Sequence, residues 1–325
     1  MSEGILDVVI VGAGPSGLAA GIEAQKHGLS YLVLEKGCIT NSIFHFPTQM
    51  IFFTTPELLE IGGLPLVSER EKPTRNEGLK YYRRVVGAYK LKVHQYEEVL
   101  RIKQHEPQKF QVQTAVAMYE ALNVVISTGY YDNPNHMGIP GEDLPHVSHY
   151  YTEAHPFYDR DVVVIGGKNS AAEAALDLFR SGARVSLVHR GAEMGKTVKY
   201  WVRPDIENRF KAGQITPYFN TRVLEITRDR VKLLKDQEVR EIPAQQVFAL
   251  TGYHPDTKFF DQLGVNYDKA TLRPQFDPQS FETNVPGIYL AGSVIGGRIN
   301  AEIFIENGRF HGEVLVEKIS RGLRG

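Results

Sequence analysis

Residues 7–37 read DVVIVGAGPSGLAAGIEAQKHGLSYLVLEKG, and the same design recurs without a gap at residues 161–191, DVVVIGGKNSAAEAALDLFRSGARVSLVHRG. The offset between the two copies is constant (161 − 7 = 154). Each copy contains an apolar strand, a glycine-containing turn, an alanine-rich helix and a second strand, which is the pattern of a dinucleotide-binding βαβ unit. Two copies predict that one chain binds two dinucleotides.

The two copies differ at the end of the second strand, where such units bind the adenosine ribose. The first copy has Glu35, 23 residues after Gly12, followed by Lys36, and the second has His189 and Arg190. An acidic side chain accepts hydrogen bonds from ribose hydroxyls, whereas a cationic pair suits an adenosine with a 2′-phosphate. A charge-assisted hydrogen bond contributes about 1.5–3 kcal/mol, so Arg190 should favour NADPH over NADH by about one to two powers of ten. We predict FAD in the first copy and NADPH in the second.

The glycine-containing turns are the predicted phosphate-binding segments. In the first, Gly12 permits the tight turn, Gly14 lets the backbone approach a pyrophosphate, and Gly17 lets helix and strand pack closely. In the second, Lys168 replaces the middle glycine, and its side chain either turns outward toward a phosphate or displaces the coenzyme from the turn. The predicted contacts are Gly12, Gly14, Pro15, Ser16 and Gly17 for FAD, and Gly166, Gly167, Lys168, Asn169, Ser170 and Ala171 for NADPH.

Composition narrows the class of protein. The 325 residues suffice for two domains, and the net charge of −1 (37 basic and 38 acidic residues) gives no field that favours nucleic acid or an anionic membrane. No run of 18 apolar residues predicts a membrane span, and the N-terminus has no signal-peptide pattern. The single cysteine, Cys38, fits a reducing compartment, so we expect a cytoplasmic protein. The 11 histidines show no metal-ligand spacing, so no metal site is predicted.

The order of the remaining patterns predicts the domain organisation. A helix begins after Thr74, which forms a capping-box pattern with Glu77. Strands at 121–127 and 247–250 both end in Thr-Gly turns, a late strand precedes Gly292, and a final helix is expected near Ala301. We predict an α/β fold with two Rossmann-like domains. The FAD domain takes 1–130 and 248–325, and the NADPH domain, with its entry linker, takes 131–247 and is inserted into it.

This organisation resembles the two-domain flavoprotein disulfide reductases of thioredoxin reductase size. The markers are the paired dinucleotide motifs, the turns Thr128-Gly129 and Thr251-Gly252, and the late strand 288–292. Those enzymes have Gly-Asp after the late strand, but here Ser293 follows Gly292, so only the backbone role of Gly292 carries over. His149 and Thr152 stand where thioredoxin reductases have Cys-x-x-Cys, and this excludes ordinary thioredoxin reduction.

Longer strings resemble the bacillithiol-disulfide reductase family, which itself carries lysine at the Lys168 position. They include FPTQM at 46–50, EKPTRN at 71–76, GGKNSA at 166–171 and IFIENG at 303–308. The resemblance implies FAD, NADPH, an oxidised low-molecular-weight thiol as substrate and a homodimer. It also implies a flavin lining from the loop 44–48, although its composition fits a packed aromatic loop equally well. The further FAD contacts that it implies are Phe46, Thr48, Val99, Thr128, Gly129, Gly292 and Ala301, with Gly252 near NADPH.

One departure from that family concerns the chemistry. Family members commonly have a cysteine in the first glycine motif, where this chain has Ser16. A serine hydroxyl without an activating base is a far weaker nucleophile than a thiolate, so no catalytic residue is certain. Three interpretations follow. The protein is a reductase of a bacillithiol-type disulfide, in which the flavin delivers the electrons directly, or a ferredoxin- or flavodoxin-NADP reductase-like enzyme, which needs no cysteine. The third interpretation is a non-catalytic NADPH-binding redox sensor. The first is the leading one, with hydride transfer from NADPH to flavin before electrons reach the acceptor.

Overall fold

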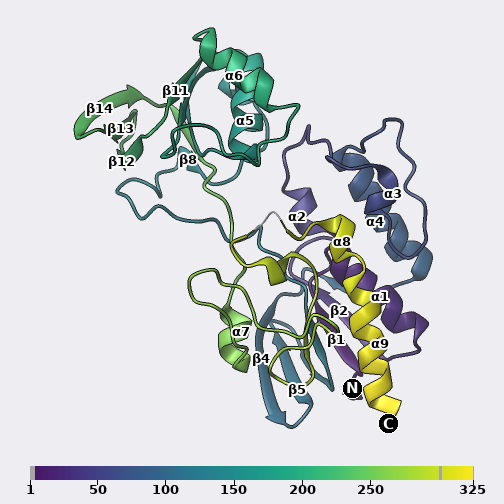
Figure 1. The fold of residues 1–325 in the computed structure, drawn as a ribbon. Coiled ribbons are helices and arrows are strands. Elements are labelled where there is room, and N and C mark those ends of the chain that lie inside the picture. The colour runs from purple at the N-terminus through teal and green to yellow at the C-terminus, as the bar shows by residue number, and fades with distance from the viewer. Residues whose placement is uncertain (1–3, 300–301, 325) are drawn as a thin grey trace. The chain divides into compact units, whose positions relative to one another are not determined.

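The computed structural model describes residues 4–299 and 302–324. The chain forms two compact units (Figure 1), the first from residues 1–133 and 253–325 and the second from residues 134–252. Each unit contains a parallel five-stranded sheet with helices on one face and an antiparallel three-stranded sheet on the other. The predicted fold class, two Rossmann-like halves with one inserted into the other, is confirmed. Within the described residues, no helix is long and apolar enough to cross a membrane.

The first unit is built on the strand order β16-β7-β1-β2-β3, with every neighbouring pair parallel. Alternate residues of β1 face opposite sides: Val8 and Ile10 pack toward the helices, and Val9 and Val11 toward the antiparallel sheet β4-β5-β6. The strands are β1 Val8–Val11, β2 Tyr31–Glu35, β3 Val93–Gln95, β4 Val99–Glu106, β5 Lys109–Thr114, β6 Met118–Ala121, β7 Val124–Ile126 and β16 Ile288–Leu290.

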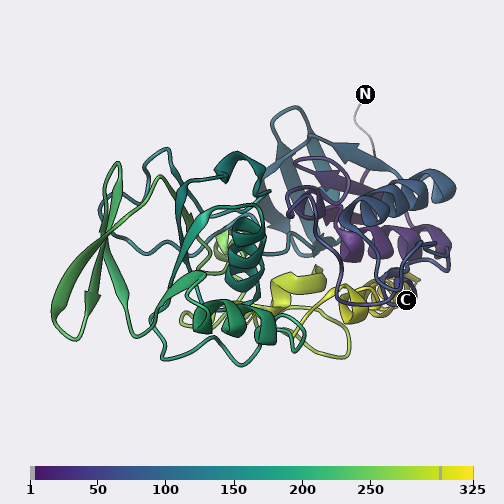
Figure 2. The same cartoon turned by 90° about the horizontal axis from the view of Figure 1, so that it is seen from above.

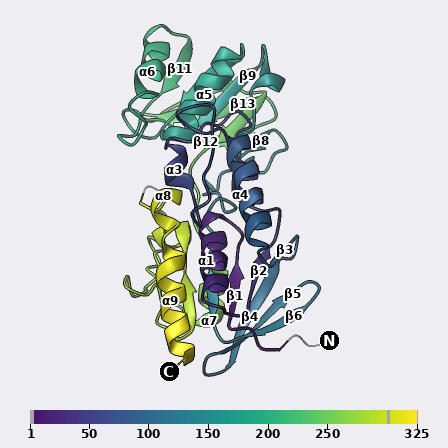
Figure 3. The same cartoon turned by 90° about the vertical axis from the view of Figure 1, so that its right-hand side faces the viewer.

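Helices α1 (Pro15–Lys26), α4 (Arg75–Tyr89) and α9 (His311–Arg324) cover one face of this sheet. In Figures 1 and 3, α9 (yellow) lies alongside α1 (purple), so the end of the chain packs on its first helix. The predicted capping box of α4 is confirmed, since Thr74 Oγ1 accepts from the Glu77 amide and the Glu77 carboxylate accepts from the Thr74 amide. The shorter helices are α2 Asn41–Phe44, α3 Pro56–Leu59, α7 Lys258–Leu263, η2 Gly292–Gly296 and α8 Ile305–Gly308.

The second unit has the parallel strand order β11-β10-β9-β15-β8. Helices α5 (Asn169–Arg180) and α6 (Arg203–Lys211) cover one face, and the antiparallel sheet β12-β13-β14, in green in Figure 2, packs on the other. The strands are β8 Val147–Ser148, β9 Asp161–Ile165, β10 Arg184–Val188, β11 Ile215–Tyr218, β12 Arg222–Ile226, β13 Arg230–Lys235, β14 Glu238–Pro243 and β15 Gln246–Ala249, with the 3₁₀ helix η1 at His155–Phe157.

Two predicted elements differ from the structure. The strand expected at 121–127 is two strands, because the chain passes from the three-stranded sheet at Ala121 to the five-stranded sheet at Val124. The helix start expected near Ala301 lies outside the described residues. Among the described residues that follow, α8 begins at Ile305, where Asn307 Oδ1 accepts from the Phe304 amide and its Nδ2 donates to the Glu302 carbonyl, and α9 begins at His311.

Candidate functional site

The first glycine turn lies between β1 and α1 and has the geometry of a phosphate-binding turn. Gly12 has φ +108, and a Cβ there would lie 2.6 Å from the Ser127 carbonyl oxygen. A Cβ on Gly17 would overlap the Gly12 carbonyl oxygen, so only glycine allows this contact between helix and turn. A Cβ on Gly14 would meet nothing within 4 Å. Gly14 is the N-cap and Pro15 the first residue of α1, and the free amides at such a helix start favour an anion.

Ser16 lies on the first turn of α1. A Cβ on Gly292 would lie 2.7 Å from Ser16 Oγ, and one on Gly308 would lie 3.0 Å from it. Ser16 therefore packs between the backbones of η2 and α8, two segments near the end of the chain.

Glu35, at the end of β2, is buried and is held by the backbone of the same unit. Its Oε2 accepts from the Ala13 amide at 2.7 Å and its Oε1 from the Gly37 amide at 2.9 Å. Burial raises the pKa of Glu35, and the two amide hydrogen bonds oppose this rise. A carboxylate has about four acceptor sites, so Glu35 can still accept from a ribose hydroxyl. The neighbouring Lys36 forms an exposed ion pair with Asp132 at 3.0 Å.

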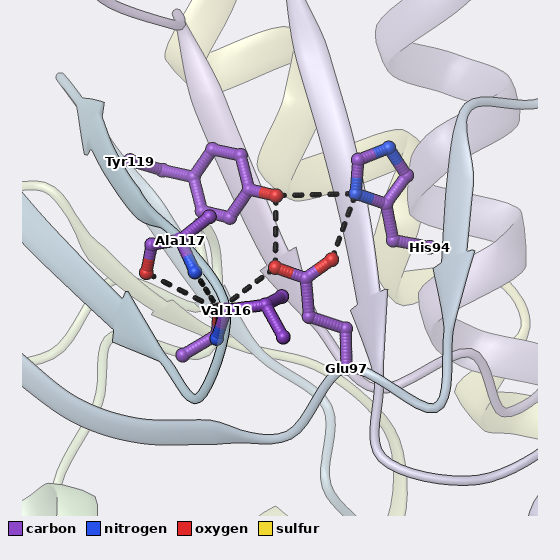
Figure 4. Close-up of polar contacts among 6 residues, drawn as sticks. His94, Glu97, Val116, Ala117 and Tyr119 are labelled. Carbon is purple, nitrogen blue, oxygen red and sulfur yellow. Dashed lines mark hydrogen bonds and ion pairs between the residues drawn. The ribbon is translucent and has the colours of Figure 1, made fainter.

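Glu97, in the segment after β3, is the centre of a polar cluster with His94, Thr114 and Tyr119 (Figure 4). Glu97 accepts from the hydroxyls of Thr114 and Tyr119, each at 2.8 Å, and lies 3.0 Å from His94 Nδ1. Burial disfavours the charge, but these hydrogen bonds outweigh it and lower the pKa of Glu97. The Glu97 amide donates to the Glu35 carbonyl at 2.8 Å, so the cluster positions the predicted ribose site. Val99, a predicted FAD contact, buries its side chain in the core.

The two Thr-Gly turns have different hydrogen bonding. Thr251 Oγ1 donates to the Asn135 carbonyl at 2.5 Å, and the Asn135 amide donates to the Gly252 carbonyl at 2.9 Å. Thr128 Oγ1, in contrast, is buried and finds no partner within the described part of the chain. A buried hydroxyl without a partner costs about 1–3 kcal/mol. Beside Gly129, which has φ +69, Thr128 therefore fits a ligand that supplies the missing partner.

The loop expected to line the flavin is a partly packed aromatic loop. Phe46 packs edge-on against Tyr131 at 4.9 Å between ring centroids, and the Tyr131 hydroxyl donates to the His45 carbonyl at 3.1 Å. Phe44 and Thr48 are exposed. The loop combines internal packing with accessible side chains, and its lining of the flavin stays a prediction.

The Gly292 backbone is bound by a buried histidine. The Gly292 amide donates to His311 Nδ1 at 3.1 Å, and the His311 ring stacks on Phe281 at 4.2 Å. Burial lowers the pKa of His311 to about 4, so the imidazole is neutral and accepts this hydrogen bond at neutral pH. The Gly292 amide is therefore bound by an internal partner, and its contact with FAD stays a prediction.

The second glycine turn, between β9 and α5, tolerates lysine for a backbone reason. Gly166 has φ +153, but Lys168 has φ −114 and ψ −167, an extended conformation open to any residue. The Lys168 side chain is exposed, consistent with its turning outward. The Asn169 side chain holds a neighbouring loop, because its Oδ1 accepts from the Lys199 amide at 2.9 Å and its Nδ2 donates to the Thr197 carbonyl at 3.0 Å.

His189 and Arg190, at the end of β10, differ in exposure: His189 is partly buried and Arg190 is exposed. A Cβ on Gly167 would overlap the His189 ring, so this ring covers the turn. Burial, and then the adjacent Arg190, lower the pKa of His189. Arg190 is exposed and has no ion pair within the described residues. The arrangement leaves Arg190 free to meet a phosphate while His189 stacks on the turn. Ser170, beside it on α5, is exposed, and Ala171 is buried.

Several supporting residues were missed by reasoning from the sequence. Glu97, Asp132 and His311 come from distant segments of the chain, and no local pattern predicts them. They contact the predicted residues Glu35, Lys36 and Gly292, respectively. Asn135 also escaped notice, although it directly follows the turn signal Asn133-Pro134. The two Thr-Gly turns are a further sequence signal for Asn135, because a threonine hydroxyl in such a turn needs a hydrogen-bond partner from another segment.

Comparison with known proteins shows the same architecture in a family of enzymes. Residues 9–292 match the family model described as pyridine nucleotide-disulphide oxidoreductase. Bacilliredoxin reductase Bdr of Bacillus subtilis (strain 168) is 44% identical over 314 residues, covering 96% of this chain and 97% of that protein. The structure named bacillithiol disulfide reductase Bdr (YpdA) from Bacillus cereus has a TM-score of 0.96 and 44% identity, covering 98% of this chain and 99% of the other. Thioredoxin reductase of T. acidophilum has a TM-score of 0.80 and 25% identity, covering 99% and 100%.

These matches confirm the predicted resemblance and the predicted enzyme class, an NADPH-dependent flavoprotein oxidoreductase, in place of a non-catalytic sensor. FAD and NADPH are the cofactors, and the open space at Gly14 and the unpartnered Thr128 hydroxyl fit such a bound group. The chain belongs to the pyridine nucleotide-disulphide oxidoreductase family.

Proposed function

We propose that this enzyme reduces the disulfide of a low-molecular-weight thiol of the bacillithiol type, with NADPH as the electron source. The first unit binds FAD and the second binds NADPH. The observation that carries the proposal is the pair of βαβ units with opposite charge at their strand ends, Glu35 and Arg190. The names of the relatives from Bacillus subtilis and Bacillus cereus support the acceptor. When bound, FAD accepts a hydride from NADPH and supplies electrons to the acceptor.

The residues of this chain bind and orient the two dinucleotides. In the first unit, the amides at the start of α1 bind the pyrophosphate, Glu35 accepts from the ribose, and Thr128 Oγ1 contributes a buried hydrogen bond. In the second unit, the turn before α5 binds the pyrophosphate and Arg190 the 2′-phosphate. These contacts hold each dinucleotide in one orientation on its own unit.

The proposal requires disulfide reduction without a thiol at the family position. Ser16 is packed against Gly292, and its hydroxyl is a poor substitute for a thiolate. Cys38 lies in the loop after β2, and burial raises the pKa of its thiol, which makes it less nucleophilic near neutral pH. The chain therefore positions the acceptor disulfide and does not form a mixed disulfide with it.

The test is anaerobic NADPH oxidation by the purified holoenzyme with oxidised bacillithiol as sole acceptor. We expect turnover in the range of about 1–1,000 s⁻¹ that is common for enzymes. Bleaching of the flavin by NADPH without turnover would overturn the proposed acceptor.

A ferredoxin or flavodoxin reductase is the second candidate, favoured by the serine at position 16. A flavin can deliver single electrons, and such an enzyme needs no cysteine. Reduction of a ferredoxin or flavodoxin, with no turnover of oxidised bacillithiol, would select it. A cytoplasmic homodimer with no nucleic-acid or membrane partner remains part of the proposal, and light scattering on the holoenzyme tests its oligomeric state.

A further inference from the structure

Two histidines and a glutamate meet in the second unit, outside the predicted dinucleotide site. His136 and Glu142 lie on the loop that leads into this unit, and His149 follows β8. Glu142 Oε1 lies 3.4 Å from His149 Nε2 and 3.7 Å from His136 Nδ1. One ligand atom from each of the three side chains lies within 4.8 Å of the others. No spacing in the sequence predicts this group, because tertiary folding brings the three residues together.

We propose that His136, Glu142 and His149 bind a divalent transition-metal ion of the Zn²⁺ type. Zinc bonds to imidazole nitrogen and carboxylate oxygen are about 2.0–2.2 Å long, so neighbouring ligands of a tetrahedral ion lie about 3.4 Å apart. The two distances from Glu142 agree with this spacing within a few tenths of an ångström. Two imidazoles and one carboxylate suit Zn²⁺ better than Ca²⁺ or Mg²⁺, which prefer oxygen ligands. A water molecule would complete the four ligands.

The loop holds Glu142 in place for this role. Glu142 is buried, and its carboxylate accepts from the amides of Met137 and Gly138, with a shortest distance of 2.7 Å to each. The side chains of Met137 and Leu144 pack against the core of the unit, so the loop is anchored on both sides of the carboxylate. Hydrogen bonds from outside the ligand set commonly orient metal-binding carboxylates.

The two histidines complete the site from different sides. The His149 side chain is 11% exposed, and its Nε2 lies on the side of Glu142 Oε1. The His136 side chain is 59% exposed, so solvent and ions reach the site. The rings lie 4.6 Å apart at an interplanar angle of 66°. The bound ion would connect the entry loop to the end of β8.

The experiment uses the untagged, full-length holoenzyme, stripped with a chelator and dialysed against ZnCl₂. We expect one Zn²⁺ per chain by elemental analysis, and an absorption spectrum of tetrahedral Co²⁺ when CoCl₂ replaces ZnCl₂. Loss of even an outer hydrogen-bond partner typically weakens metal binding about 10–100-fold. We therefore expect His136→Ala to weaken Zn²⁺ binding at least about tenfold, and Glu142→Gln to weaken it further.

The control is His155→Ala, which removes an exposed histidine of the same unit outside the cluster. We expect its Zn²⁺ affinity to equal that of the unmodified protein. His136 is exposed, so its replacement should leave the fold intact, and circular dichroism checks this. The proposal is overturned if the unmodified protein binds no stoichiometric Zn²⁺, or if His136→Ala and His155→Ala bind it equally well.

Discussion

Ser16 packs directly against Gly292, so that a Cβ on Gly292 would lie 2.7 Å from Ser16 Oγ and 2.9 Å from Ser16 Cβ. Gly292 also has φ +75, which disfavours any side chain. We expect Gly292→Ala to lower the free energy of unfolding by about 2 kcal/mol or more, because clash adds to backbone strain. Gly63 is the matched control, since it has φ +76 and open space around its Cβ position. Equal melting temperatures for Gly292→Ala and Gly63→Ala would show that the contact between Ser16 and Gly292 does not contribute to the stability of the fold.

Ser16→Cys tests whether the acceptor disulfide reaches the start of α1. We make this change in a Cys38→Ser background, so that position 16 carries the single thiol. A thiolate there can exchange with a disulfide, which serine cannot do. We expect oxidised bacillithiol to form a mixed disulfide with the variant but not with Cys38→Ser alone, as measured by mass spectrometry without NADPH. Absence of the adduct would place the acceptor elsewhere.

The repeat of residues 7–37 and 161–191 made much of the fold predictable. Both glycine turns and the strand-end residues Glu35 and Arg190 follow from local spacing, because a βαβ unit has a fixed periodicity. The difference between Thr128 and Thr251 did not follow, since it depends on where Asn135 lies after folding.

The same limit applies to other long-range contacts. The start of α8 at Ile305 is fixed by side-chain hydrogen bonds of Asn307, which an apolar pattern does not reveal. The cluster of His136, Glu142 and His149 joins the entry loop to the residue after β8, which pairs with β15. Local spacing predicts elements and turns, whereas these contacts depend on the tertiary structure.

Glu35→Ala tests the proposed ribose site. The change removes the acceptor of the Ala13 and Gly37 amides and of a ribose hydroxyl. Loss of one charge-assisted hydrogen bond of about 1.5–3 kcal/mol corresponds to about ten- to hundredfold weaker FAD binding. FAD content after gel filtration measures the effect, and Glu120→Ala, an exposed carboxylate of the same unit, serves as the control. Unchanged FAD content in Glu35→Ala would count against the ribose role.

Arg190→Ala tests the assignment of the 2′-phosphate. Arg190 is exposed and has no ion pair in the described structure, so its removal should leave the fold intact. We expect the Kd for NADPH to rise about ten- to hundredfold while that for NADH changes little. Titration of both coenzymes, with Arg228→Ala as the exposed control, measures the difference. Equal losses for NADPH and NADH would remove the basis for the assignment.

His311 predicts acid sensitivity of the first unit. Burial lowers its pKa from 6.5 to about 4, so between these values the unfolded chain binds a proton that the folded chain excludes. The stability from neutral His311 is therefore complete above about pH 6.5 and is lost as the pH falls toward 4. At about 1.36 kcal/mol per pKa unit, the loss of stability approaches about 3 kcal/mol.

His311→Gln removes the titration while keeping an acceptor for the Gly292 amide. Melting temperatures from pH 7 to 4 should fall less steeply for His311→Gln than for the unmodified protein or the exposed control His105→Gln. Parallel curves for all three would show that His311 does not cause the acid sensitivity.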